Sequence, residues 1–127
     1  MIENDIAKTT VDAAYRIHTT LGPGLLESVY ETVLTHELQK RGLNVQRQVP
    51  INVIYDGVIL RDAFRADLIV NGRVIIEIKS TESSPPVHKK QLLTYLRLSH
   101  LRLGLLLNFG APLIKDGITR IVNGLHP

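Results

Sequence analysis

Cysteine is absent from this chain of 127 residues, and aromatic residues are few. Without cysteine the protein has no disulfide, no thiolate zinc site and no cysteine nucleophile. Aromatic side chains make up 5% of the chain, as four Tyr and two Phe. We therefore expect no platform of stacked aromatic rings for binding a single nucleic-acid strand.

Long apolar runs are also missing. The longest, residues 103–107, is far too short to cross a bilayer. The first ten residues include Glu3, Asp5 and Lys8 and have no apolar core, unlike a secretory signal. We expect a cytoplasmic protein with no membrane segment.

The composition is sufficient for one buried core. The chain is 44% hydrophobic, its mean hydropathy is +0.08, and its length is near that of a single domain. No repeat, linker or low-complexity segment interrupts it, so we expect one domain over residues 1–127. A net charge of +3 and a pI near 9.4 are compatible with a nucleic-acid partner, but are too mild to indicate one alone.

The hydrophobic periodicity changes along the chain from helical to alternating and back. Gly22-Pro23-Gly24 separates two helical patterns, Gly42 ends the second, and Pro50 indicates an edge strand or a bulge. In the second helix the apolar residues expected on one face are Leu26, Val29, Tyr30, Val33, Leu34 and Leu38. The pattern predicts helices at 6–21, 25–41 and 87–99, and strands at 45–55, 58–70, 73–79, 103–109 and 118–122. This order predicts an α/β domain with a mixed β-sheet flanked by α-helices.

Three charged residues on the central hairpin are the strongest functional candidates. Asp67 lies in the strand 58–70, and Glu77 and Lys79 lie two residues apart in the most apolar strand, so the last two share a face. Neighbouring carboxylates repel each other unless a cation neutralises them. Their oxygens suit Mg²⁺ or Mn²⁺, which polarises a phosphoryl oxygen and activates water. Lys79 is placed to orient that water or to stabilise developing negative charge.

The turn at Asn71-Gly72 decides whether these residues meet. A two-residue turn would pair Asp67 with Ile76 and leave Glu77 on the opposite face. A three-residue loop, with Gly72 in the left-handed conformation, returns Asp67 to the face of Glu77. The metal-site hypothesis therefore predicts a three-residue loop or a bulge. The alternative is a half-exposed strand in which Glu77 and Lys79 form an ordinary surface ion pair.

Other polar residues could complete such a site. Gln91 and Tyr95 are four apart on one helix and share a face; otherwise they are a solvated residue and a half-buried aromatic. Glu27, near the start of the second helix, is either a further metal carboxylate or a favourable charge at the helix N-terminus. Arg65, Lys89 and Lys90 are candidate phosphate contacts or simply solvated charges. The five histidines show no convincing metal spacing.

These motifs together resemble a known family. Gly24-x-x-Glu27-x-x-Tyr30 matches the signature of the small GxxExxY proteins, which belong to the PD-(D/E)XK nuclease superfamily. The similarity spans nearly the whole chain and includes Gln48-Val49-Pro50, Arg65-Ala66-Asp67, Gln91 to Tyr95 and residues 106–110. Ala66 replaces the proline that often precedes the aspartate.

The resemblance implies a restriction-endonuclease-like core of the RecB-like branch. It implies Asp67 and Glu77 as metal ligands, Lys79 as the catalytic lysine, Glu27 as the helical acid, and Gln91 with Tyr95 as the Gln-x-x-x-Tyr element. The leading hypothesis is a Mg²⁺- or Mn²⁺-dependent nuclease that hydrolyses DNA phosphodiesters.

Two alternatives stay open. One is a catalytically inactive nuclease-fold module that binds nucleic acid or a protein partner. The other is an interaction subunit acting as a homodimer through the segment 103–109 or the first helix.

Overall fold

A computed structural model describes residues 2–125. Its elements confirm the predicted order of two helices, three strands, a helix and two strands, with one added 3₁₀ turn. The helices are α1 (Glu3–Leu21), α2 (Glu27–Lys40) and α3 (Pro86–Ser99), the strands are β1 (Val45–Tyr55), β2 (Val58–Val70), β3 (Val74–Lys79), β4 (Leu103–Asn108) and β5 (Ile118–Val122), and the 3₁₀ turn is η1 (Ile114–Gly117).

The five strands form one mixed sheet in the order β1-β2-β3-β4-β5. Only β3 and β4, which α3 connects, run parallel; the other neighbours are antiparallel. Pro50 lies in β1 at the edge of the sheet, as expected for a residue that cannot donate a ladder hydrogen bond.

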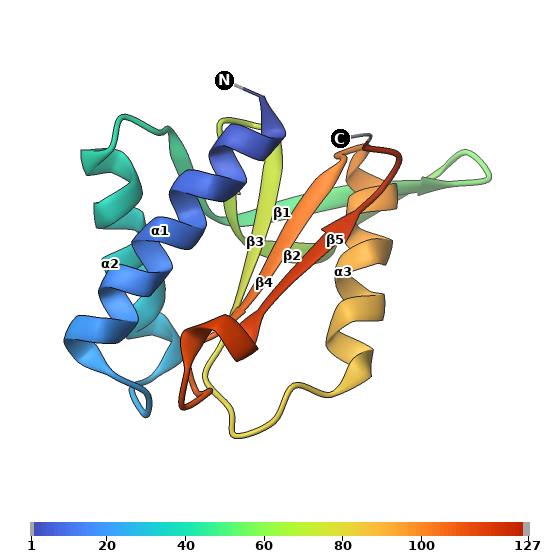
Figure 1. Cartoon of the computed structure of the whole chain (residues 1–127). Coiled ribbons are helices and arrows are strands. Elements are labelled where there is room, and N and C mark those ends of the chain that lie inside the picture. The colour runs from blue at the N-terminus through green and yellow to red at the C-terminus, as the bar shows by residue number, and fades with distance from the viewer. Residues whose placement is uncertain (1, 126–127) are drawn as a thin grey trace.

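The helices cover the two faces of the sheet unequally. Figure 1 shows α1 and α2 side by side against one face and α3 alone against the other. The larger core lies under α1 and α2, where Ile6 and Leu34 pack with Val74, Ile76 and other side chains of β2, β3 and β4. The smaller core lies under α3 and includes Ile75, Leu92 and Leu96. Ile75 faces one core and its neighbours Val74 and Ile76 the other, as strand alternation requires.

The central strands are buried on both faces. All six residues of β4 are buried, as predicted for its apolar run. This corrects one expectation, because the segment 103–109 lies inside the protein and offers no apolar face to a second subunit. Within the described residues, no helix is long and apolar enough to span a membrane.

The predicted apolar face of the second helix is only partly right. Tyr30, Leu34 and Leu38 are fully buried, but Leu26 is 73% exposed and Val29 is 38% exposed. Leu26 is the N-cap residue, which precedes the first turn of the helix. Val29 lies about 100° around the helix axis from the buried Tyr30, so it points away from the core. Helix α2 therefore presents a narrower stripe to the core than the count of apolar residues suggested.

Candidate active site

The hairpin between β2 and β3 has the three-residue loop that the metal-site hypothesis requires. Val70 pairs with Val74, which leaves Asn71, Gly72 and Arg73 in the loop. Asn71 and Gly72 both have positive φ values, 51° and 65°, a conformation that Asn and Gly adopt at low cost. Continued by one step beyond the last ladder pair, this register sets Asp67 opposite Glu77, so the predicted register is confirmed.

Where Asp67 lies opposite Glu77, side-chain hydrogen bonds replace the backbone hydrogen bonds of the ladder. The last backbone pair is Leu68 with Ile76. Beyond it, the Asp67 backbone N–H donates to Glu77 Oε2 at 3.1 Å, and the Ile78 N–H donates to Asp67 Oδ2 at 2.8 Å. The two carboxylates thus sit where the strands begin to separate, and each is held by the other's strand.

The alternation of side chains in both neighbouring strands reverses at this same point. In β2, Ala66 packs in the α3-side core whereas Leu68 packs in the core under α1 and α2, although residues two apart normally share a face. Opposite Asp67 in β1 lies Gln48, whose φ is 49°, unusual for a residue that is not glycine. The reversal puts Asp67 between the two faces, with Glu77 on the α3 side.

Burial makes Glu77 the most perturbed group of the site. Its side chain is 8% exposed. Burial, reinforced by the negative charge of Asp67, raises the pKa of Glu77 to about 9, and nearby Lys79 only partly offsets this. Glu77 therefore holds a proton near neutral pH. The alternative of a surface ion pair fails, because Glu77 is buried and makes no ion pair with Lys79 among residues 2–125.

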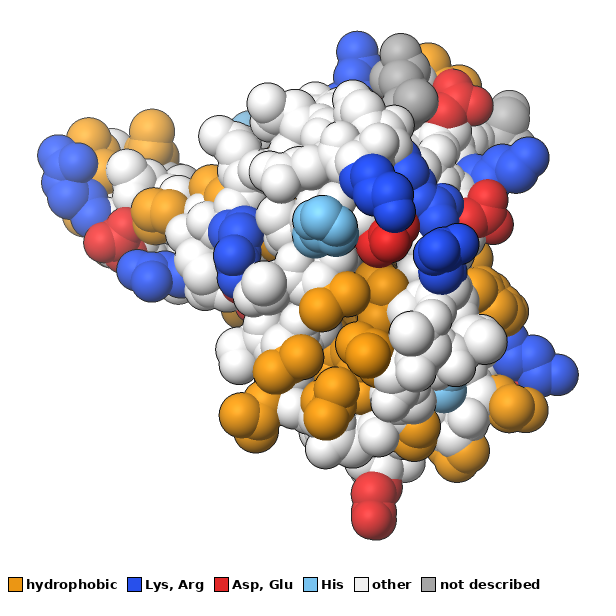
Figure 2. Space-filling view, turned by 90° about the vertical axis from the view of Figure 1, so that its left-hand side faces the viewer, with side chains coloured by type: hydrophobic (Ala, Val, Ile, Leu, Met, Phe, Trp, Pro, Cys, Tyr) orange, Lys and Arg blue, Asp and Glu red, His pale blue; other side chains and the backbone are white. Residues whose placement is uncertain are grey.

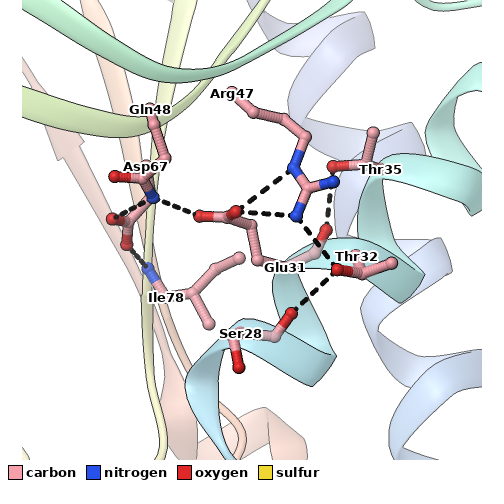
Figure 3. Close-up of polar contacts among 8 residues, drawn as sticks. All are labelled: Ser28, Glu31, Thr32, Thr35, Arg47, Gln48, Asp67 and Ile78. Carbon is pink, nitrogen blue, oxygen red and sulfur yellow. Dashed lines mark hydrogen bonds and ion pairs between the residues drawn. The ribbon is translucent and has the colours of Figure 1, made fainter.

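A cavity of about 390 Å³ opens on the α2 side of Asp67. We call it the acidic cavity; its lining is Glu27, Ser28, Glu31, Gln48, Asp67 and Ile78. Figure 3 shows Gln48 between two carboxylates, with Nε2 donating to Glu31 Oε1 and, at 3.5 Å, to Asp67 Oδ1. Arg47 holds the other oxygen of Glu31 at 2.9 Å. A chain of polar contacts thus runs from α2 through β1 to Asp67.

Sequence reasoning missed Glu31 and Arg47 and noted Gln48 only within a motif. One signal was present, since Glu31 lies one residue after Tyr30 and three before Leu34, a charge among core positions of the helix. Its buried side chain requires a partner. Which partner, Arg47 or Gln48, depends on how α2 packs over β1.

Glu27 lies at the rim of the acidic cavity. It is exposed and occupies the first turn of α2, so both interpretations of this residue stay compatible with the structure. Tyr30 fixes the turn before it: its hydroxyl donates to the Gly22 carbonyl and accepts from the Leu25 N–H. The Tyr30 ring stacks on Phe109 at 4.4 Å between centroids. Gly24 has a φ of 102°, so the Gly-x-x-Glu-x-x-Tyr pattern shapes the entry to α2.

On the other side, α3 brings Tyr95 to the carboxylates. Burial and the charges of Glu77 and Asp67 raise the pKa of Tyr95, and a hydrogen bond from Gln91 opposes the rise. The Tyr95 ring stacks on Phe64 of β2 at 4.0 Å between centroids. Tyr95 is thus fixed by the strand that carries Asp67, while Gln91 is exposed.

The loop after Lys79 is held by one buried side chain. Asn108 Oδ1 accepts hydrogen bonds from the Thr81 and Gly110 N–H groups, and its Nδ2 donates to the Thr81 carbonyl and Ser84 Oγ. A side chain at Gly110 would collide with the backbone of Thr81. These contacts fix the end of β3, where Lys79 shares the face of Glu77 and is partly exposed.

The three candidate phosphate contacts do not form one patch. Lys89 and Lys90 are exposed in the first turns of α3. Arg65 is exposed on β2, but it points away from the face of its neighbours Phe64 and Ala66, which pack toward α3. The lysines and Arg65 therefore belong to different faces of the sheet.

The donor atoms fit a divalent cation in part. Asp67 and Glu77 supply two adjoining carboxylates, and Mg²⁺ is often held by one or two carboxylates with the remaining positions left to waters and phosphate oxygens. Among residues 2–125, no group of three or more His, Asp or Glu side chains is close enough to hold a metal ion. Glu27 would have to move to join the pair.

Comparison with known proteins agrees with this architecture. The family model of the PD-(D/E)XK nuclease superfamily matches residues 4–121. The crystal structure of SSO0001 is similar, with a TM-score of 0.57 and 25% identity over 97% of this chain. This chain spans 59% of the length of that one. The curated proteins gave no match. With its mixed sheet flanked by helices and this match over nearly its full length, the chain belongs to the PD-(D/E)XK nuclease superfamily.

Proposed function

We propose that this protein, as a member of the GxxExxY group, hydrolyses DNA phosphodiesters in the cytoplasm with Mg²⁺ or Mn²⁺ at Asp67 and Glu77. The observation that carries the proposal is the carboxylate pair itself. A buried Glu77 next to Asp67 costs stability, as its raised pKa shows, and a bound cation would remove that cost. Stored strain of this kind is typical of functional sites.

The metal, when bound, would polarise a phosphoryl oxygen and lower the pKa of a water. Asp67 and Glu77 would hold it, and Glu77 would give up its proton on binding. Glu27, from the rim of the acidic cavity, would supply a further carboxylate.

Lys79 would act on the reacting water. It shares a face with Glu77 and is partly exposed, so its ammonium group is available beside the carboxylates. From there it would orient the attacking water and stabilise the negative charge that develops on the phosphate.

Helix α3 would bind the DNA strand. Tyr95 faces Glu77 and Asp67, and Gln91 is exposed one turn earlier, so both are placed to contact a phosphate or a water beside the metal. Lys89 and Lys90, directly before Gln91 near the start of the same helix, would attract the DNA backbone. Arg65, on the opposite face of the sheet, would contact only a second strand or a longer substrate.

The test is a melting and cleavage series with wild type, Asp67→Asn and a matched control, Asp62→Asn, which removes an exposed carboxylate five residues away in β2. Millimolar Mn²⁺ is expected to raise the melting temperature of wild type and the control but not of Asp67→Asn, because the metal binds only the folded site. Single-stranded, duplex and branched DNA are then offered with Mn²⁺. Cleavage by wild type and the control, reduced at least about a hundredfold in Asp67→Asn, is expected.

A nuclease-fold module without turnover is the second candidate. It is favoured by one observation, that only two carboxylates meet in the described chain while Glu27 stays at the rim. For such a module, Mn²⁺ would shift no melting curve and no DNA would be cut, while Asp67→Asn would bind DNA as tightly as wild type. That result would overturn the nuclease proposal.

A further inference from the structure

The outer half of the β1–β2 hairpin extends beyond the rest of the sheet (Figure 1). We call residues 53–60 the arm. A bulge marks its base: Ile51 pairs with Phe64 but Val53 pairs with Leu60, and the Asp62 N–H donates to Asn52 Oδ1 at 2.9 Å within the bulge. A bulge bends and twists a ribbon, which directs the arm away from the body.

The arm carries five exposed apolar side chains within eight residues. The exposed fractions are Ile54 72%, Tyr55 73%, Val58 56%, Ile59 55% and Leu60 45%. Figure 2 shows the arm as a projection with hydrophobic side chains around it. Both of its faces are affected, because Ile54 pairs with Ile59 on one face and Tyr55 pairs with Val58 on the other.

The shape of the arm is well specified although its faces are uncovered. Asp56 and Gly57 form the two-residue turn between Tyr55 and Val58, with φ values of 50° and 77°. Positive φ at both positions defines the turn that matches the twist of a hairpin. An isolated two-stranded ribbon is at best marginally stable in water, and an exposed apolar patch of this kind often marks a binding surface, so the arm is a candidate for contact with another surface.

We propose that the arm is a dimerisation element that packs against the arm and the α3 groove of a second copy of this chain. The α3 groove is the hollow of about 420 Å³ at the foot of the arm, lined by Ile51, Asn52, Val53, Ile54, Arg97, Leu98, Ser99 and His100. Leu98 is 39% exposed there. A two-fold axis would let each arm enter the partner's groove, so the interface closes with two copies.

The available area agrees with a dimer. Large apolar side chains each offer about 150–200 Å² when fully exposed, so the five arm residues at their fractions offer on the order of 500 Å². Two arms offer about 1,000 Å², and the groove residues outside the arm, such as Leu98, bring the total near 1,200 Å², the lower end of stable protein interfaces. One arm on a flat surface would bury only about half of this.

The charges on the arm favour a second copy of the chain over nucleic acid as its partner. The arm and its bulge carry Asp56 and Asp62 against a single Arg61, so the arm has no basic surface for a phosphate backbone. In the dimer, Asp56 at the tip of one arm would meet Arg97 in the groove of the other. The chemistry of the arm thus favours a second copy over DNA.

The test is sedimentation of the full chain, without metal or DNA, from about 1 to 100 µM. We expect wild type to approach twice its 14.2 kDa mass as the concentration rises. The double variant Ile54→Lys/Ile59→Glu changes one cross-strand pair into opposite charges, which keeps the hairpin pairing and the net charge. It is expected to stay monomeric with an unchanged circular dichroism spectrum.

The matched control is Leu21→Glu/Leu113→Lys, at two exposed apolar positions outside the arm, 41% and 56% exposed. It is expected to dimerise like wild type. A monomeric wild type at the highest concentration overturns the proposal, and so does a dimer that the arm variant does not break. If wild type is monomeric and the arm variant loses DNA binding in a separate mobility-shift assay, the arm is instead a nucleic-acid element. None of these outcomes depends on whether the protein cleaves DNA.

Discussion

The inner and outer halves of the β1–β2 hairpin have similar sequences and opposite surroundings. Both halves contain several Val, Ile and Leu residues, and the turn at Asp56-Gly57 lies at the tip of the outer half. In the inner half, Leu68 and Val70 are fully buried under α1 and α2, and Phe64 is covered by Tyr95 of α3. In the outer half, the C-terminal end of α3 lies only beside the foot, next to Val53 and Ile54, and the five apolar side chains of the arm stay exposed. Strand propensity therefore does not reveal burial, which depends on what lies above the strand.

The candidate site residues lie in or beside the inner half of the hairpin, where helices cover the strands but the side-chain alternation is irregular. Asp67 and Gln48 occupy the step at which both strands reverse their faces, and Glu77 opposes them from β3. Buried neighbours hold Glu77 beside Asp67, where Glu77 keeps its proton. The arm has the reverse properties, with a regular ladder and no polar cluster.

The largest expected difference between the halves is in stability. Leu68→Ala should lower the free energy of unfolding by about 3 kcal/mol, because it leaves a cavity in the core. Leu60→Ala, at a position 45% exposed in the arm, should change it by less than about 0.5 kcal/mol. Urea denaturation of the monomer at low concentration measures both. Equal losses would mean that the arm is part of the cooperative core.

Glu77→Gln should stabilise the metal-free protein. Because the folded-state pKa of Glu77 lies at about 9, above its usual 4.5, the folded state keeps a proton that the unfolded state releases, and the free energy of unfolding falls as pH rises between these values. The amide removes this loss while keeping the shape of the side chain. We expect a gain of about 2 kcal/mol at pH 8 that disappears near pH 4.5.

Denaturation of wild type and Glu77→Gln at several pH values measures this difference. Saturating Mn²⁺ should reverse the order at pH 8, since only wild type keeps the full ligand pair. A difference that is independent of pH would show that burial beside Asp67 does not raise the pKa of Glu77.

Substitution of Gln48 should have the smallest effect of the three, and it should change metal affinity more than the free energy of unfolding. Its amide holds Asp67 and Glu31 together from a left-handed backbone conformation, so Gln48→Gly removes the contact without adding backbone strain. Loss of a residue that orients a metal ligand should weaken Mn²⁺ binding about tenfold. Gln46→Ala, two residues earlier on the same strand, is the control and should bind Mn²⁺ like wild type. Calorimetric titration with Mn²⁺ measures both, and equal affinities would make Gln48 a purely structural residue.

Much of the fold was predictable because it depends on local pattern. Residues 45–55, 58–70 and 118–122 are strands over the predicted bounds, and the other elements differ by a few residues at their ends. The three-residue loop at Asn71 to Arg73 followed from the requirement that Asp67 and Glu77 meet. The buried face of α2 was only partly predictable, because the position of Leu26 outside the helix depends on the turn that Tyr30 holds.

The candidate site also contains residues that the sequence predicted and residues that it did not. Asp67, Glu77 and Lys79 could be named because carboxylates and a lysine in an apolar strand have few explanations. Glu31 and Arg47 could not, since their contact joins residues 16 positions apart through the packing of α2 on β1. The roles proposed for Glu27, Gln91 and Tyr95, and for Arg65, Lys89 and Lys90, stay predictions.

The sequence by itself determined the α/β order of elements, the superfamily and the placement of an acidic pair on the central hairpin. These depend on periodicity, turn residues and motif spacing, which are local along the chain. Only the tertiary structure decided that the side-chain alternation of β2 reverses at Asp67 and that Gln48 and Glu31 form polar contacts beside Asp67. It also decided that the arm is left uncovered. Each of these depends on which helix lies over which strand, and burial between distant segments is a property of the packed molecule rather than of any one stretch of residues.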